Sequence, residues 1–180
     1  MDPRLHHLQG KTERVKSAEL LQFLREFYRE KSALRQRHVA AARLVVDYDY
    51  NNAYQYVINR EDVHLTWLYD AITDQGGTAE DAPEPRLDAA GKGKGKKEDA
   101  QTAVLSEDRD QAQAFVDRWR ERVEHMNHAR LRTLLRVVLG ETLEQKRFFE
   151  QALAGRTDLL GRRADGAGTK GVVLPTRWVN

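Results

Sequence analysis

One amphipathic helix, expected over residues 54–72, constrains the fold more than any other stretch of this 180-residue chain. Its apolar side chains recur at intervals of three and four residues, which places them on one face of a helix. That face comprises Tyr54, Val57, Ile58, Leu65, Leu68 and Ile72. Glu61 and His64 fall on the same face, so a carboxylate and an imidazole stand where apolar side chains are expected.

This pair of ionisable residues has two interpretations. Burying a carboxylate is costly unless something compensates its charge, and a metal ion is one such compensation. The spacing Glu-x-x-His provides the carboxylate and imidazole ligands of di-metal helical bundles. The alternative is an ordinary pair of side chains, three residues apart, on a partly hydrated face. Because any Glu and His at this spacing fit the motif, Glu61 and His64 alone do not decide between them.

Composition excludes several classes of protein. Lys and Arg number 30 against 28 Asp and Glu, a net charge of +2 with the two signs interleaved, so we expect no nucleic-acid partner. The absence of cysteine excludes disulfides, thiolate metal sites, iron–sulfur clusters and a cysteine nucleophile. No apolar run reaches the roughly 18 residues of a membrane span, and residues 1–14 lack the apolar core of a signal peptide. The expected protein has no membrane partner and is cytoplasmic.

Helical periodicity and breaks divide the chain into three parts. Residues 1–16 lack a sustained pattern and are expected to form a mobile N-terminal segment. Residues 17–154 are expected to form a four-helix bundle, with a break at 47–52 and a crossover linker at 75–102. The third and fourth helices are expected at 103–126 and 129–153. Residues 155–180 are rich in glycine and are expected to form a flexible C-terminal tail.

Acidic residues occur in or beside the apolar stripe of every expected helix. Glu30 lies between Phe27 and Leu34, and Asp108 lies between Leu105 and Ala112. Glu141 interrupts the fourth stripe, with Glu144 one turn further on. Together with Glu61, the acids Glu30, Asp108 and Glu141 would put four carboxylates in one core, which would be unstable without cations if all four were charged. The alternatives are that the acids are protonated, paired with inward-reaching arginines such as Arg37 or Arg147, or exposed to water.

Two short turns and one long crossover are typical of a ferritin-like arrangement of four helices. Over residues 17–154 the chain resembles the ferritin-like superfamily, and most closely its rubrerythrin-type members. The resemblance implies an all-α, ferritin-like bundle that holds two iron or manganese ions. The implied metal ligands are Glu30, Glu61, His64, Asp108, Glu141 and Glu144.

The chain departs from the family pattern in three ways. Glu144 stands where the family has a second histidine, and Asp108 is one methylene shorter than the usual Glu. The cysteine-rich electron-transfer domain of full rubrerythrins is missing, which excludes a peroxidase with its own electron relay.

Two functions from different classes follow. The first is a di-metal carboxylate protein, a ferroxidase-type oxidoreductase that oxidises iron(II) or handles oxygen or peroxide. The second is a non-catalytic ferritin-like scaffold or interaction protein with a degraded metal site. We expect a homodimer, because most soluble oligomers are symmetric dimers of identical chains. The tail ends in apolar residues, including Leu174 and Trp178, which either fold back on the bundle or dock on a protein partner.

Overall fold

Four helices make up the computed structural model, which describes residues 3–87, 94–161 and 171, with side chains described outside 3–16 and 94–96. They are α1 (Pro3–Ala42), α2 (Tyr48–Asp74), α3 (Lys94–Glu124) and α4 (Ala129–Leu153). The described part of the chain contains no strand. The all-α four-helix bundle expected from the sequence is therefore confirmed.

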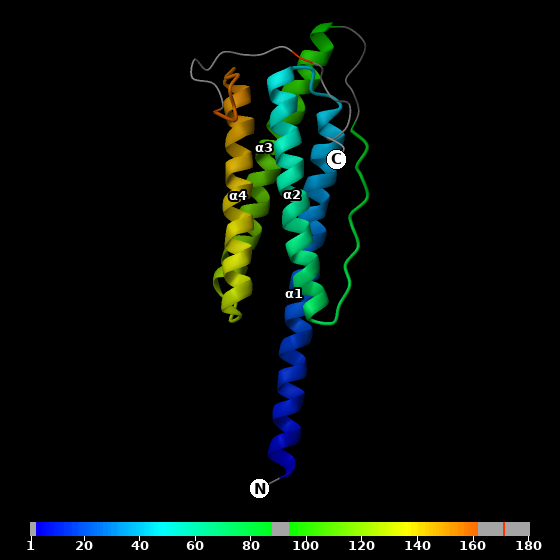
Figure 1. Ribbon diagram of the computed structural model, residues 1–180, viewed down its shortest axis with the longest axis vertical. Coiled ribbons are helices and arrows are strands. Elements are labelled where there is room, and N and C mark those ends of the chain that lie inside the picture. The colour runs from blue at the N-terminus through cyan, green and yellow to red at the C-terminus, as the bar shows by residue number, and fades with distance from the viewer. Residues whose placement is uncertain (1–2, 88–93, 162–170, 172–180) are drawn as a thin grey trace.

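The helices form two antiparallel hairpins, α1 with α2 and α3 with α4, joined by one long crossover (Figure 1). The short turns span residues 43–47 and 125–128, and the crossover starts after Asp74. Its described part, 75–87, runs back along α1, so α2 and α3 point the same way. Tyr28 donates a hydrogen bond to Asp81 (2.7 Å) and Arg25 donates one to the Thr78 carbonyl (2.9 Å), which fastens this segment to α1.

Short polar residues and glycines end the helices where the sequence places its breaks. The Asp47 side chain caps α2 by accepting hydrogen bonds from the backbone amides of Asp49 and Tyr50. After α2, Gly76 has φ +74°, and after α4, Gly155 has φ +76°. These are left-handed conformations that favour glycine.

The predicted apolar stripes are buried. Among the fully buried side chains are Leu24, Phe27, Tyr54, Val57, Ile58, Leu68, Ile72, Ala112, Trp119, Val123, Leu135 and Val138. Apart from Ala112, these residues belong to two apolar clusters, one toward each end of the bundle. On α2 the buried residues of one cluster end at Ile58 and those of the other begin at Leu65, and on α4 the two sets are separated between Leu139 and Phe149. A polar layer lies between them.

Two boundaries differ from the sequence prediction. α1 begins at Pro3 and not at Ser17, and it extends beyond the ends of the other helices (Figure 1). α3 begins at Lys94, so the crossover is shorter than the predicted 75–102. Most of the tail, including Leu174 and Trp178, lies outside the described residues. Among the described helices, none has an apolar stretch long enough to cross a membrane.

Candidate functional site: a lysine-centred polar core

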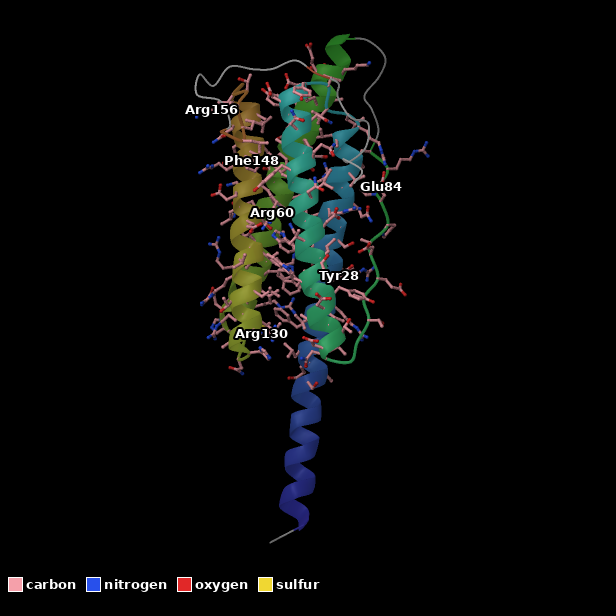
Figure 2. All side chains as sticks on the ribbon, viewed as in Figure 1. Tyr28, Arg60, Glu84, Arg130, Phe148 and Arg156 are labelled. Atoms are coloured by element: carbon pink, nitrogen blue, oxygen red, sulfur yellow. The ribbon has the colours of Figure 1, made fainter. Side chains whose placement is uncertain are left out.

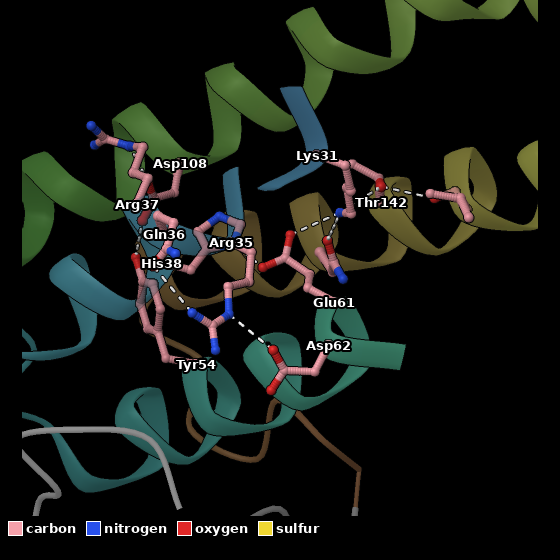
Figure 3. Close-up of polar contacts among 12 residues, drawn as sticks. Lys31, Arg35, Gln36, Arg37, His38, Tyr54, Glu61, Asp62, Asp108 and Thr142 are labelled. Atoms are coloured by element: carbon pink, nitrogen blue, oxygen red, sulfur yellow. Dashed lines mark hydrogen bonds and ion pairs between the residues drawn. The ribbon is translucent and has the colours of Figure 1, made fainter. Parts of the chain in front are cut away.

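A buried lysine ammonium occupies the polar layer at the middle of the bundle. Lys31 comes from α1, and its side chain is fully buried. Its Nζ donates to Glu61 Oε1 at 2.8 Å, to Thr142 Oγ1 at 3.2 Å and to Gln145 Oε1 at 3.3 Å. Figure 3 shows Lys31, Glu61 and Thr142 converging from three different helices. The cation that compensates Glu61 in this core is therefore the chain's own ammonium group.

The second oxygen of Glu61 contacts a buried imidazole. His38 Nδ1 lies 2.8 Å from Glu61 Oε2, and both side chains are inaccessible to solvent. Burial alone would raise the pKa of Glu61, but the charges of His38 and Lys31 outweigh it and lower that pKa to about 2. Burial opposes protonation of His38, yet the neighbouring Glu61 carboxylate raises the pKa of His38 above its usual value. Glu61 is thus an ionised carboxylate held between two cationic groups.

His64 belongs to a separate cluster, on the side of α2 that faces α4. Its Nε2 lies 2.8 Å from Glu141 Oε2. Arg60 binds the same carboxylate with two nitrogens, at 2.9 Å from Nε and 2.6 Å from Nη2. Figure 2 shows Arg60 between α2 and α4. Burial, with the nearby charge of Lys31, lowers the pKa of His64 to about 4, so His64 is neutral at pH 7. Glu141 is 31% exposed and is neutralised mainly by Arg60.

Asp108 is buried, but its partners are an arginine and a tyrosine. Arg37 Nε and the Tyr54 hydroxyl each donate to one of its oxygens, both at 2.5 Å. Burial and the Asp108 charge raise the pKa of Tyr54 well above its usual value, so the phenol keeps its proton. Pairing with Arg37 is one of the alternatives that the sequence left open for the buried acids.

The two remaining predicted ligands lie outside the core. Glu30 is 34% exposed, accepts a hydrogen bond from Trp119 Nε1 at 2.9 Å, and forms an ion pair with Arg118 at 2.9 Å. Glu144 is 58% exposed and lies 3.5 Å from Arg147 on the same helix. The structure therefore places Glu61, His64 and Asp108 inside, and places Glu30, Glu141 and Glu144 at or near the surface.

A one-residue difference in helix register explains this outcome. In the polar layer, Lys31 of α1 and Thr142 and Gln145 of α4 are buried, whereas Glu30 and Glu141, the residues directly before Lys31 and Thr142, are not. The sequence does contain a signal for the inward positions, because strict alternation of three- and four-residue steps leads from Leu24 through Phe27 and Lys31 to Leu34. On α4 the same alternation leads from Leu131 through 135, 138, 142, 145 and 149 to Ala152.

The residues that share the centre do not fit a pair of metal ions. Two divalent ions require several carboxylates around them, whereas this centre has one carboxylate, the His38 imidazole, an ammonium, a hydroxyl and a neutral amide. Within residues 3–87, 94–161 and 171, no group of three or more His, Cys, Asp or Glu is arranged to hold a metal ion. The ammonium charge already balances that of Glu61.

Comparisons with known proteins add no further assignment. No family model matches the chain, and searches of curated proteins and of solved structures found no similar protein. The resemblance to ferritin-like proteins therefore remains a prediction from the sequence motifs.

Proposed function

We propose that this protein is a metal-independent helical scaffold, an interaction protein of ferritin-like arrangement without di-metal chemistry. The observation that carries the proposal is the position of Lys31. Its ammonium is fully buried and 2.8 Å from Glu61, the carboxylate that the di-metal hypothesis needs most. An ammonium group cannot ligate a metal while it is protonated, and its charge repels a divalent ion nearby.

The neighbouring residues support the same proposal. Thr142 and Gln145 have the three-residue spacing of Glu61 and His64 and point toward the same centre, but they are uncharged. The Thr142 hydroxyl also donates to the Val138 carbonyl at 2.8 Å, so this residue is satisfied without a metal. Lys31 and Glu61 together form a neutral pair, and such a core needs no divalent ion for its stability.

Elemental analysis tests the proposal. We expect untagged protein to contain far less than one equivalent of iron or manganese after incubation with either ion, and its melting temperature to be unchanged by a chelator. The same measurements should give the same result for Glu61→Gln and for the exposed control Glu144→Gln.

The di-metal oxidase hypothesis predicts a different outcome. Its specific support is that Glu61 and His64 are both buried, one helical turn apart on α2. About two equivalents of iron or manganese per chain, lost in Glu61→Gln and retained in Glu144→Gln, would overturn the scaffold proposal.

A further inference from the structure

The first part of α1 is a helical arm that leaves the bundle. We define the arm as residues 3–16, which precede Ser17; Ser17 itself lines a pocket together with residues of the α3–α4 turn. In Figure 1 the arm continues past the end of the bundle where α2 ends and α4 begins, and no other described helix accompanies it. At 1.5 Å per residue, the arm is about 21 Å long.

The sequence of the arm is basic and contains leucines. Arg4, Lys11, Arg14 and Lys16 stand against one acid, Glu13, a net charge of +3 when the histidines are neutral. Leu5 and Leu8 are three residues apart, a spacing that places two positions on the same side of a helix. A short helix that projects from its bundle is only marginally stable in water by itself, so such an arm gains stability from packing against another surface.

A groove of complementary character lies at the same end of the bundle, between α2 and α4. We call it the α2/α4 groove; its apolar lining includes Trp67, Ala71, Leu131, Leu134 and Val137. Val137 is 43% exposed, so part of this apolar lining is accessible to a partner. The groove spans about eight residues of α2, or about 12 Å, so the arm is long enough to cover it.

The α2 side of the groove is negatively charged. Asp70 and Asp74 are exposed there, and the last turn of α2 has no basic residue. The carboxyl end of α2 has a partial negative charge, which adds to that of the two aspartates, and the amino end of α4 on the other side of the groove has a partial positive charge. On the α4 side, Arg130 and His128 line the groove; Arg130 is labelled at this end of α4 in Figure 2. A basic segment with apolar residues is therefore attracted most strongly to the α2 side.

We propose that the arm of one copy binds in the α2/α4 groove of a second copy, which forms a symmetric dimer. The arm points away from its own bundle, so it does not reach its own groove (Figure 1). A twofold axis makes both contacts at once, because each copy contributes one arm and one groove. The positive arm and the negative end of α2 supply the charge complementarity. This proposal concerns a different surface from the polar core, and it does not depend on whether that core binds metal.

Variants of the whole 180-residue chain with reversed charges in the arm or in the groove test the proposal. Sedimentation equilibrium should show a monomer–dimer equilibrium that weakens as salt is added. An arm variant, Arg4→Glu/Lys11→Glu, and a groove variant, Asp70→Lys/Asp74→Lys, should each raise the dimer dissociation constant at least about tenfold. Mixing the two variants should restore a heterodimer of wild-type affinity, because both of its contacts again join opposite charges.

Glu80→Lys/Asp99→Lys changes the same amount of charge at exposed positions outside the groove and should leave the dissociation constant unchanged. Circular dichroism checks that all three variants are folded. The proposal is overturned if the wild-type chain is monomeric at every concentration. The proposal is also overturned if the arm variant or the groove variant dimerises like the wild type. It is overturned as well if mixing the two variants gives no heterodimer of wild-type affinity.

Discussion

Replacing Lys31 by methionine should destabilise the bundle strongly. Methionine has a similar length and is apolar, so Lys31→Met removes the ammonium with little change in volume. Glu61 then remains buried with His38 as its only cationic hydrogen-bond partner, and Thr142 and Gln145 lose the donor that joins them to α1. The change should therefore lower the free energy of unfolding at neutral pH.

The size of this effect follows from the burial of the pair. Removing one partner of a buried ion pair costs roughly 3–5 kcal/mol, because the other charge is left uncompensated. His38 still contacts Glu61, which favours the lower end, about 3 kcal/mol. The pKa of Glu61 gives a similar figure. Its lowering from 4.5 to about 2 corresponds to about 3 kcal/mol at neutral pH, supplied jointly by Lys31 and His38.

Urea denaturation followed by circular dichroism measures the effect. Lys31→Met/Glu61→Gln removes both charges, and it also removes the carboxylate that raises the pKa of His38, so the buried imidazole can lose its proton. Its stability should return to within about 1 kcal/mol of the wild type, since such a core has no unpaired ion. Arg136→Met, which breaks the exposed pair with Glu124, should leave the midpoint unchanged. A Lys31→Met loss below about 1 kcal/mol would refute the view that this ammonium compensates Glu61.

Three further predictions concern acid sensitivity, helix propensity and the metal ligands. Because the pKa of His64 is lowered to about 4, the unfolded chain binds more protons between about pH 6.5 and pH 4, so stability should fall as the pH drops through this window. His64→Asn should remove that decline in urea midpoints; an unchanged pH dependence would contradict the assignment. Gly140→Ala should raise the free energy of unfolding by about 1 kcal/mol, because Gly140 lies inside α4 with nothing within 4 Å of an added Cβ. A lower melting temperature would show that the space is not open. Finally, Lys31→Glu/Thr142→Glu/Gln145→His should bind about two equivalents of manganese by elemental analysis, since it provides carboxylates and an imidazole at the inward positions. Absence of bound metal would show that these positions cannot form a di-metal site.

Much of the fold was predictable because helical periodicity is local. The stripe from Tyr54 to Ile72 is buried as its spacing predicts, including the two ionisable residues Glu61 and His64. The break before α2 and the glycine after α4 also lie where short polar residues and glycine favour the end of a helix. The early start of α1 was missed because residues 3–16 show no sustained apolar pattern.

The sequence by itself determined that four amphipathic helices pair as two hairpins, and that charged groups enter their common core. Only the tertiary structure decided which charged groups meet there. Adjacent residues of a helix differ by about 100° in direction, so a shift of one position exchanges Glu30 for Lys31 and Glu141 for Thr142. The rotation of each helix is set by how all four stripes pack together. For that reason the partner of Glu61 is an ammonium group from another helix, which the pattern of any single helix does not reveal.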